Sequence, residues 1–491
     1  MSTTTNPYRL ARTVTPEAYR IFLSPDLEAY TFSGRVEVDV TIAEPTNTVT
    51  LHAIELDLDP ATVTAAGTAH RSVDLSYNQT YQTATFTFDQ PLPVGPAVVE
   101  IAFTGTLNDQ LHGFYRSTFT DAQGTSHVIA TTQFEPSDAR LAFPCWDEPS
   151  FKATYQVNLT VPSHLAAFSN SPTASETDLG NGFKTVAYTP TMKMSTYLVA
   201  FAVGPFEVSR TVDVDGVPLR VIYPVGKGHL VDLALESGEF ALRFFTNYFN
   251  IPYPGDKLDM IAIPDFAFGA MENLGLVTYR ETLLLLDPEN ASLMEKQRVA
   301  EVVAHEIAHM WFGDLVTMEW WEGIWLNEAF ATFMATMCTN AFRPEWRFWT
   351  GFGIDRDMAM QVDGLHTTRP IEYEVISPDD TRGMFDVLTY EKGGSVLRML
   401  EQWLGEETFR DGIRHYLKCH SYANTVTTDL WNALEEKSGQ PVTDVANTWI
   451  LQGGHPVVTL TDGNLHQQPF QYGPARGESA IGSSWLVPVL T

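Results

Sequence analysis

The sequence predicts a multidomain α+β protein, in which a β-rich N-terminal part precedes a helical part that carries a metal-binding motif. Three observations support this fold class. Apolar residues alternate at period two in several segments before about residue 205, and they recur at helical spacing in several segments after about residue 231. The motif His305-Glu306-Ile307-Ala308-His309 lies within one of the helical segments. The length of 491 residues is enough for about three domains of ordinary size.

The β-rich part is predicted to span residues 1–205. Residues 36–42 and 83–88 alternate apolar and polar side chains, which is typical of half-buried strands. Residues 97–103 and 153–161 continue the pattern, and Pro, Gly and Asn residues separate these segments. We therefore expect an N-terminal domain built as an antiparallel β saddle or sandwich.

The catalytic domain is predicted to span residues 206–452. Residues 219–224 and 259–264 are strand candidates that precede or interrupt the helical segments. Helical spacing marks the following stretches: residues 231–249, 293–341, 389–418 and 429–436. A mixed sheet followed by many helices should therefore carry the metal motif.

The last part, residues 453–491, returns to strand-like sequence. Residues 456–460 predict one strand, and the apolar run Trp485–Leu490 predicts another at the end of the chain. An apolar strand in that place would need a partner or a cover for its edge. We expect these residues to be the beginning of a β-sandwich domain that is truncated here.

Composition limits the classes of partner. The chain has 60 acidic and 30 basic residues, for a net charge of -30, which disfavours binding to nucleic acid or to anionic membranes. No segment approaches the roughly eighteen apolar residues that span a bilayer, and the first twelve residues lack the apolar core of a signal peptide. A cytoplasmic location is expected. The cysteines are too few and too scattered for a disulfide framework or a CxxC metal site, and we expect buried structural thiols at Cys145, Cys338 and Cys419.

The spacing of the metal motif predicts a catalytic zinc site with one ion per chain. Residues four apart face the same side of a helix, so His305 and His309 can ligate one ion. Glu328 follows after a stretch long enough for a turn and a second helix, and it is the predicted third ligand. Three protein ligands leave a fourth position for water, which Glu306 can deprotonate as general base.

A histidine pair on a buried helix can also be simple packing. The flanking residues argue against this interpretation: Val302, Val303, Ile307, Ala308 and Met310. These apolar neighbours predict a buried helix that nevertheless carries several ionisable groups. Buried ionisable groups are costly unless they are paired or bound to a metal, and we therefore favour the metal site.

The sequence around these residues resembles the zinc aminopeptidases of the gluzincin type, which include aminopeptidase N and the puromycin-sensitive aminopeptidases. The resemblance covers most of residues 1–460. It rests on the metal motif with Glu328 and on these blocks: Gln133 to Arg140, Phe143 to Pro149, Gly269-Ala270-Met271-Glu272-Asn273, Trp311 to Asp314, Trp325 to Ala331 and Tyr390-Glu391-Lys392-Gly393-Gly394. It implies a thermolysin-like catalytic domain and a peptide substrate with a free N-terminus.

The resemblance also implies roles for residues outside the metal motif. Tyr390 would stabilise the oxyanion formed at the attacked carbonyl, whereas the sequence alone favours an ordinary helix tyrosine at this position. Glu135 and Glu272 would bind the terminal ammonium group, although they also suit a rim carboxylate and a turn residue. The implied substrate-binding set is Gln133, Glu135, Gly269, Ala270, Met271, Glu272 and Asn273.

Departures from the family pattern leave the acid, base and ligand residues intact. Leu274 stands where Trp is frequent, Ala329 where Gly is frequent and Leu141 where a second Arg is frequent. Relatives continue into a large helical domain, so we expect this chain to be an N-terminal fragment of a longer enzyme. The alternatives are an epoxide hydrolase of the leukotriene hydrolase type, in which Gly is common at position 270, and a catalytically weak peptide-binding scaffold. The oligomeric state and the preferred N-terminal residue stay open.

Overall fold

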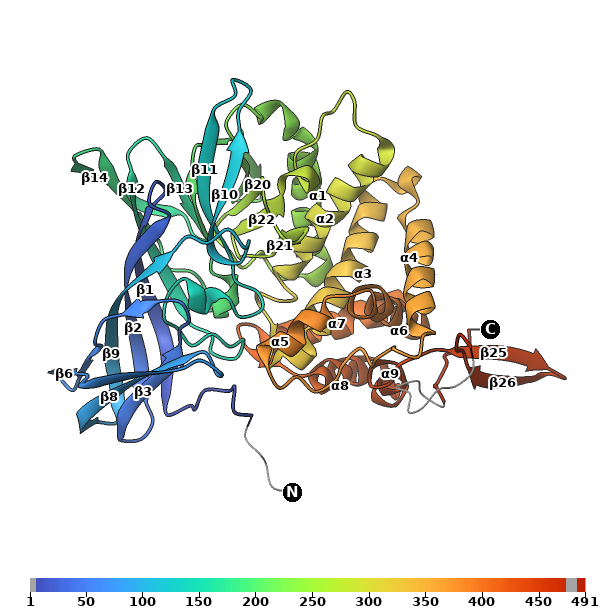
Figure 1. The fold of residues 1–491 in the computed structure, drawn as a ribbon. Helices are drawn as coiled ribbons and strands as arrows, with labels where there is room; N and C mark the ends of the chain where they lie inside the picture. Colours follow the sequence, from blue (N-terminus) through green and yellow to red (C-terminus); the bar gives the residue numbers. More distant parts are fainter. Residues whose placement is uncertain (1–5, 474–483, 491) are drawn as a thin grey trace. The chain divides into compact units, whose positions relative to one another are not determined.

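The structure is a computed structural model that describes residues 6–473 and 484–490 (Figure 1). It divides into two compact units. The first unit comprises Met1–Glu239 and Tyr253–Val299, and the second comprises Phe240–Pro252 and Ala300–Thr491. Strands predominate in the first unit and helices in the second, so the predicted multidomain α+β class is confirmed.

The first unit contains a nine-stranded sheet whose long strands are β1 (Val14–Asp26), β2 (Thr31–Ile42), β9 (Gly95–Thr106) and β12 (Thr154–Pro162). Burial alternates along β1 and β2, as the period-two sequence predicts for strands with one face on the core. The pair β1 and β12 is parallel, whereas β1 and β2 are antiparallel. The long chain segment between β1 and β12 permits this parallel pairing, which a hairpin would not.

Shorter strands complete this part of the first unit. Those of the nine-stranded sheet are β4 (Asp57–Leu58), β5 (Thr62–Ala65), β6 (Thr68–Arg71), β14 (Thr173–Gly180) and β15 (Phe183–Tyr188). A three-stranded sheet contains β3 (Thr46–His52), β7 (Asp74–Asn78) and β8 (Thr83–Leu92). A four-stranded sheet contains β10 (Gly113–Thr120), β11 (Ser126–Gln133), β13 (Ala166–Ser169) and β16 (Phe201–Gly204). Strand β11 ends at Gln133, which is one of the predicted substrate-binding residues.

A six-stranded mixed sheet follows in the same unit. Its members are β17 (Phe206–Val208), β18 (Val212–Val214), β19 (Val217–Pro224), β20 (Leu258–Ile263), β21 (Ala270–Met271) and β22 (Leu276–Arg280). Strand β20 is buried along its whole length and is parallel to both neighbours, which explains its nearly continuous apolar sequence. Strand β21 is the edge strand and runs antiparallel to β22. The Gly269–Asn273 block therefore lies at a sheet edge.

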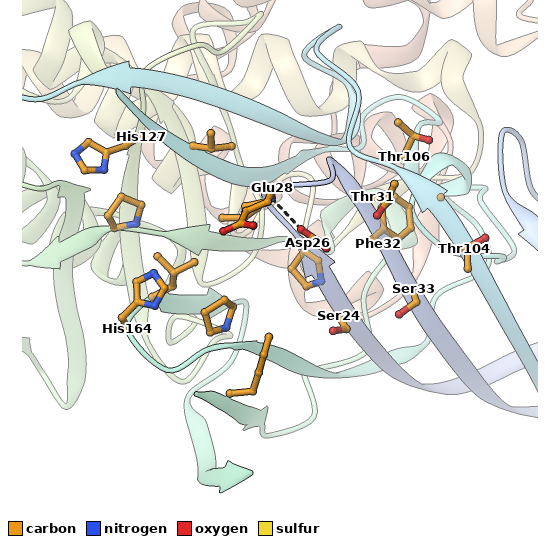
Figure 2. Close-up of a pocket in the computed structure, with 18 of the residues that line it drawn as sticks. Ser24, Asp26, Glu28, Thr31, Phe32, Ser33, Thr104, Thr106, His127 and His164 are labelled. Carbon is orange, nitrogen blue, oxygen red and sulfur yellow. Dashed lines mark hydrogen bonds between the residues drawn. The ribbon is translucent and has the colours of Figure 1, made fainter. Parts of the chain in front are cut away.

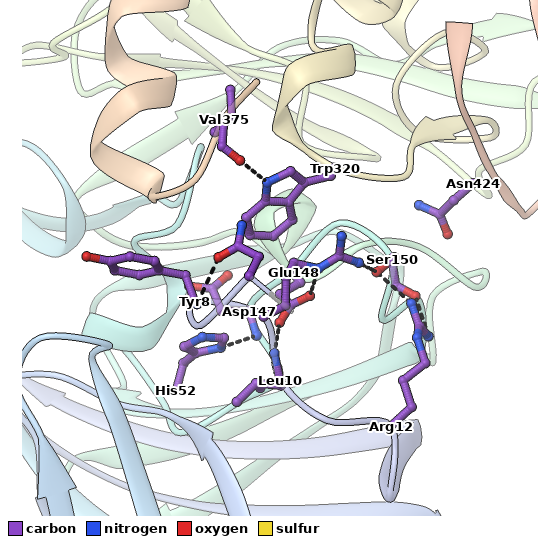
Figure 3. A network of polar contacts seen from close by, with 12 residues as sticks. Tyr8, Leu10, Arg12, His52, Asp147, Glu148, Ser150, Trp320, Val375 and Asn424 are labelled. Carbon is purple, nitrogen blue, oxygen red and sulfur yellow. Dashed lines mark hydrogen bonds and ion pairs between the residues drawn. The ribbon is translucent and has the colours of Figure 1, made fainter. Parts of the chain in front are cut away.

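A buried polar network ties the N-terminal segment to this unit (Figure 3). Glu148 is 2% exposed and accepts hydrogen bonds from the Arg9 guanidinium, at 2.8 Å, and from the Leu10 backbone N–H. The neighbouring Asp147 pairs with Arg140 at 2.8 Å, and both side chains are buried. Buried charges persist when they are paired in this way. The family block Phe143 to Pro149 therefore serves the packing of the first unit.

The second unit is mainly helical. Its helices, yellow to red in Figure 1, are α3 (Trp325–Phe342), α4 (Phe348–Asp363), α5 (Pro378–Thr381), α6 (Gly393–Leu404), α7 (Glu406–His420), α8 (Thr427–Ser438) and α9 (Val442–Ile450). Two helices run across the unit boundaries in sequence, α1 (Asp232–Phe249) and α2 (Leu293–His309). A short parallel pair joins β23 (Thr317–Met318) to β24 (Asn424–Thr425). None of the helices in the described ranges is both long and apolar enough to cross a membrane.

Aromatic stacking and indole hydrogen bonds stabilise the core of the second unit. The rings of Trp325 and Trp431 stack with centroids 5.5 Å apart, and the indole N–H of Trp325 donates to Thr427 at 3.0 Å. The indole N–H of Trp320 donates to the Val375 carbonyl at 2.9 Å (Figure 3). Buried tryptophans with a satisfied N–H add apolar contact without an unpaired donor.

The end of the chain corrects one expectation. Strands β25 (Pro456–Thr461) and β26 (Asn464–Pro469) form an antiparallel hairpin, as expected for the first of them. The prediction of a strand at Trp485–Leu490 is wrong, because the described residues 484–490 are irregular. Their backbone bonds go to side chains: Trp485 N–H donates to Gln467, and Leu486 N–H donates to Thr448. These side-chain acceptors take the place of the backbone carbonyls that a neighbouring strand would supply.

The cysteines are also only partly as expected. Cys145 and Cys338 are buried, and burial raises the pKa of both thiols. Cys419 is exposed near the end of α7, so the expectation of a third buried thiol is wrong. A position near the end of an amphipathic helix is ambiguous in sequence, because a small rotation decides whether the side chain faces the core.

Candidate active site

Helices α2 and α3 bring the three predicted metal ligands together within the second unit. The Nε2 atoms of His305 and His309 are 3.1 Å apart. The Oε2 atom of Glu328 lies 3.3 Å from Nε2 of His305 and 3.4 Å from Nε2 of His309. Three ligand-type atoms from residues as far apart as 305 and 328 thus lie in a tight triangle.

The dimensions of this triangle fit a small divalent ion. Zinc takes histidine nitrogen and carboxylate oxygen at about 2.0 to 2.2 Å, and two vertices of such a tetrahedron are about 3.3 to 3.6 Å apart. Two of the observed separations, 3.3 and 3.4 Å, lie within that range, and the third, 3.1 Å, is slightly shorter. The two imidazoles and one carboxylate form a group that could hold a metal ion.

The orientation of His309 is set by its own backbone surroundings. Its Nδ1 atom lies 2.9 Å from the Phe312 carbonyl oxygen, which orients the ring and leaves Nε2 for the metal triangle. Gly313 has φ +137°, and a Cβ at this position would lie 3.3 Å from His309 Nδ1. Sequence reasoning missed the Phe312 carbonyl, because a backbone acceptor leaves no signature in side-chain identities.

The carboxylate of Glu328 is held in its charged form. Burial by itself would raise the pKa of this carboxyl, but the adjacent His309 and His305 imidazoles outweigh that effect and lower the pKa. The Glu328 side chain is only 4% exposed. An ionised carboxylate beside two imidazole nitrogens is the chemical state that a metal requires of its ligands.

Glu306 occupies the position next to the first ligand on α2. It is 5% exposed, and a carboxylate oxygen of Glu306 lies within 4.8 Å of a ring nitrogen of His309. The apolar neighbours predicted to surround the motif are buried, including Val303, Ile307 and Ala308. A carboxylate in this place is close enough to the triangle to exchange a proton with a water molecule held there.

Tyr390 lies beside the first ligand. Its ring faces the ring of His305, with centroids 6.0 Å apart and planes 20° from parallel. The residue belongs to the π-helical turn Leu388–Lys392, which we call the Tyr390 turn. Turns of this kind are rare and are frequent at functional sites. The local expectation of an ordinary helix tyrosine does not describe this backbone.

A close helix contact places the Tyr390 turn against the helix of Glu328. At Gly393, which begins α6, an added Cβ would lie 2.6 Å from the Cβ of Ala329 on α3. That distance is shorter than a side chain tolerates, so glycine is required unless the two helices move apart. Ala329 directly follows Glu328. The close contact between Gly393 and Ala329 therefore fixes the position of the Tyr390 turn relative to Glu328.

The first unit brings together three of its predicted substrate-binding residues. The side-chain amide of Gln133 donates to the Met271 sulfur at 3.4 Å and to the Glu135 carbonyl at 3.5 Å. Gln133 is 1% exposed, and its side-chain oxygen has no hydrogen-bond partner among the residues that the structure describes. A buried acceptor of this kind is available to a donor on a ligand.

The predicted substrate-binding residues of the block Gly269–Asn273 lie in and beside the edge strand β21, whereas Glu135 follows the end of β11. Glu135 and Glu272 are 6% and 2% exposed, so two carboxylates from distant sequence positions are buried in this unit. The amide of Asn273 donates to the Thr278 hydroxyl at 3.0 Å, which fixes the turn after β21. Gly269 and Ala270 are half-buried, and the Gly269 carbonyl accepts the backbone N–H of Arg280 at 2.9 Å.

A separate cavity of about 1260 Å³ lies elsewhere in the first unit (Figure 2). Its lining includes Asp26, Glu28, His127 and His164, but none of the predicted site residues. His127 pairs with Asp121 at 2.8 Å.

Two comparisons with known proteins agree with these features. Residues 233–449 match the Peptidase family M1 domain, and residues 15–198 match the Peptidase M1 N-terminal domain. Together the two matches cover most of the chain and include every candidate site residue. The chain belongs to peptidase family M1.

Curated relatives extend the similarity along nearly the whole chain. Aminopeptidase M1-C of Oryza sativa subsp. japonica is 45% identical over 485 residues, which are 98% of this chain and 54% of the relative. Aminopeptidase M1 of Arabidopsis thaliana is 44% identical, with 98% and 55% covered. The puromycin-sensitive aminopeptidase of Caenorhabditis elegans is 42% identical, with 98% and 52% covered. The chain thus spans about half the length of the curated relatives it matches.

Proposed function

We propose that this chain contains the catalytic centre of a zinc-dependent aminopeptidase, which hydrolyses the N-terminal peptide bond of peptides. The triangle of His305, His309 and Glu328 is the observation that carries the proposal. Its edges of 3.1 to 3.4 Å suit one zinc ion per chain. Membership of peptidase family M1 supports the same reaction class.

Glu306 is proposed as the general base. The three ligands would hold a zinc ion, which would act as a Lewis acid and lower the pKa of a nearby water toward neutral pH. Glu306 accepts that proton as the water oxygen attacks the peptide carbonyl. The same carboxyl then donates the proton to the leaving nitrogen, so that the base is restored at the end of the cycle.

Tyr390 is proposed to stabilise the oxyanion. The attacked carbonyl oxygen gains negative charge, and a phenol held beside the ligand His305 can donate a hydrogen bond to it. A neutral phenol suits this role because it donates without placing a second cation beside the metal. Its position relative to His305 supports the assignment.

The first unit is proposed to bind the substrate. Glu135 and Glu272 would bind the terminal ammonium group, and a buried ion pair of this kind sets which peptide bond is cleaved. The free Gln133 oxygen would accept a hydrogen bond from the same terminal residue. Gly269, Ala270, Met271 and Asn273 would line the approach. Together they would limit the activity to peptides with a free N-terminus.

The alternatives from the sequence receive less support. The relatives named above are all aminopeptidases by name, which favours peptides over a lipid epoxide. A non-catalytic scaffold has no reason to retain ligand atoms at metal spacing together with Glu306 and Tyr390. The cytoplasmic location and the lack of nucleic-acid and membrane partners stay predictions.

Metal analysis combined with a substrate panel tests the proposed function. The purified chain should contain about one zinc ion per molecule and should release the reporter group from aminoacyl amides with a free amine. A chelator should abolish the release, and added zinc should restore it. Reporters with an acetylated amine should be cleaved far more slowly than those with a free amine. Zinc-loaded protein that leaves every free-amine reporter intact would contradict the proposal and favour the scaffold.

The variant Glu306→Gln separates binding from chemistry. It keeps the shape of the side chain but cannot accept a proton, so kcat should fall about a hundredfold to ten-thousandfold. Zinc content should stay unchanged, because Glu306 is not one of the three ligands. Glu319→Gln is a matched control outside the ligand triangle, and its kcat should equal that of the unsubstituted chain.

A further inference from the structure

The Tyr390 turn is held at both ends by one short stretch of chain. Residues 363–369 begin at the last residue of α4 and contain Asp363 and Arg369. Asp363 binds the residue at the C-terminal end of the turn, and Arg369 binds residues at its N-terminal end. We call the two residues the anchors of the turn.

The C-terminal anchor is a buried ion pair. The Nζ atom of Lys392 lies 2.9 Å from Oδ2 of Asp363, and the two side chains are 8% and 1% exposed. Nζ also donates to the Gly454 carbonyl at 3.2 Å. Asp363 accepts further bonds from the Thr368 hydroxyl and from the Gly454 N–H, at 2.7 and 2.8 Å. Such a fully hydrogen-bonded pair permits little movement of Lys392.

The N-terminal anchor is a guanidinium that binds two side chains at this end of the turn. Nη2 of Arg369 donates to Oδ1 of Asp386 at 2.7 Å and to the Thr389 hydroxyl at 2.9 Å. The same Asp386 oxygen accepts the backbone N–H of Leu388 at 2.8 Å. Arg369 therefore fixes both the residue that caps the turn and a residue inside it.

The π-helical geometry makes such anchors necessary. The Lys392 N–H bonds to the Val387 carbonyl at 3.0 Å, and the Glu391 N–H bonds to the same oxygen at 3.1 Å. The Val387 carbonyl thus accepts one α-helical bond, from Glu391, and one π-helical bond, from Lys392. If the π-helical bond were lost, the backbone could relax to an ordinary α-helix. That relaxation would rotate Tyr390 about the helix axis, away from the face that it now presents to His305.

We propose that Asp363 and Arg369 are positioning residues, which keep the Tyr390 turn π-helical and so aim the Tyr390 hydroxyl at the reacting carbonyl. This role rests on the proposed function, because it is meaningful only if Tyr390 takes part in the reaction. Neither anchor belongs to the metal triangle or to the proposed substrate-binding set. Misplacement of a reacting group by about 1 Å costs on the order of a hundredfold in rate, so the anchors contribute through kcat.

A double-mutant cycle with Tyr390→Phe tests this role. Arg369→Met should lower kcat about tenfold to a hundredfold with Tyr390 present, and KM should change little. In the Tyr390→Phe background the same substitution should have almost no further effect on kcat, because the group that it misplaces is gone. Arg369→Lys should recover part of the loss. Equal losses in both backgrounds would overturn the proposal.

Two further variants keep the test decisive. Thr389→Val removes one acceptor of the Arg369 guanidinium at nearly constant volume, and it should show the same dependence on Tyr390 with a smaller loss. Arg414→Met is the matched control, since Arg414 also ties two helices through the Tyr248 and Asn247 carbonyls. The control should lower kcat by the same factor in both backgrounds, or not at all.

Hydrogen–deuterium exchange separates failure of this role from failure of the proposed function. Arg369→Met should speed exchange in residues 386–394, whereas Arg414→Met should leave that segment unchanged. Unchanged exchange in the Arg369→Met variant would overturn the positioning role, even in an active enzyme. Zinc-loaded protein without turnover would overturn the proposed function and, with it, the role in catalysis, whatever the exchange result.

Discussion

The ring of Tyr390 faces the ring of His305 at a centroid distance of 6.0 Å, although the two residues lie in different helical segments. His305 is the first ligand candidate, so the tyrosine is placed beside the metal triangle. The close contact between Gly393 and Ala329 maintains this relation, because it fixes α6 against the helix that carries Glu328.

Tyr390→Phe should lower kcat about a hundredfold or more and leave KM nearly unchanged, because it removes a donor that acts on the oxyanion. Steady-state kinetics with an aminoacyl reporter measure both constants. Tyr422→Phe is the matched control, since Tyr422 is 47% exposed, and it should leave kcat unchanged. An unchanged kcat in Tyr390→Phe would reject the assignment.

Zinc should stabilise the metal-free protein. A ligand present at a hundred times its Kd adds about 2.7 kcal/mol to the free energy of unfolding, so thermal melting should shift upward on zinc addition. Glu328→Ala should largely remove this shift in melting temperature, because the substitution removes one of the three proposed zinc ligands. Glu306→Gln should keep it. A full shift in Glu328→Ala would mean that zinc binds elsewhere.

Glu272→Ala should lower kcat/KM chiefly for substrates with a free amine. The substitution removes a carboxylate that is 2% exposed and is proposed to bind the terminal ammonium group. Parallel assays with free-amine and acetylated peptides measure the selectivity between the two. The ratio of the two kcat/KM values should fall, whereas an equal loss for both peptides would contradict the role.

Gly393→Ala should lower the free energy of unfolding by about 1 to 3 kcal/mol, since the new Cβ would lie 2.6 Å from the Ala329 Cβ. Denaturant titration measures the change. Gly351→Ala in α4 is the matched control, because a Cβ there meets no atom within 4 Å. The control should be neutral or stabilising by up to about 1 kcal/mol. Equal effects of the two substitutions would show that the helix contact is loose.

Asp363 should make stability depend on pH in acid. Burial raises the pKa of this carboxyl, but His455 and Lys392 lower it further than burial raises it, to about 2. The unfolded value is about 3.9, so ionisation contributes about 2 to 3 kcal/mol of stability above roughly pH 5. This contribution is lost as the pH falls from about 4 toward 2.

Denaturant titrations of Asp363→Asn across that range measure the effect. The difference in unfolding free energy between the unsubstituted chain and the variant should be largest near pH 6. It should narrow as the carboxyl becomes protonated in both the folded and the unfolded protein. A difference that stays constant from pH 6 to pH 2 would show that Asp363 is not held ionised.

Sequence reasoning reached the metal ligands more securely than the other candidates. The spacing of His305 and His309 follows from helix periodicity, so one motif already implied that the two rings share a face. Glu328 required the assumption that a second helix returns to the first, and the structure places its oxygen 3.3 Å from His305. Tyr390 required family resemblance, because nothing local predicts a π-helical turn at Leu388–Lys392.

Two errors have a common physical origin. The apolar run at residues 485–490 has strand propensity, but its amides bond to Gln467 and Thr448, and it is irregular. Cys419 lies on an amphipathic helix, and its exposure depends on how that helix packs. In both cases neighbours distant in sequence override a local preference.

By itself the sequence determined the α+β class, the helix that bears the paired imidazoles, and the residue types suited to a hydrolytic metal site, because these depend on periodicity and side-chain chemistry. Only the tertiary structure decided that Glu328 closes the triangle, that the Phe312 carbonyl orients His309, and that Asp363 and Arg369 anchor the Tyr390 turn. Such relations join residues far apart in the chain, and their distances arise from the packing of whole helices rather than from any local pattern.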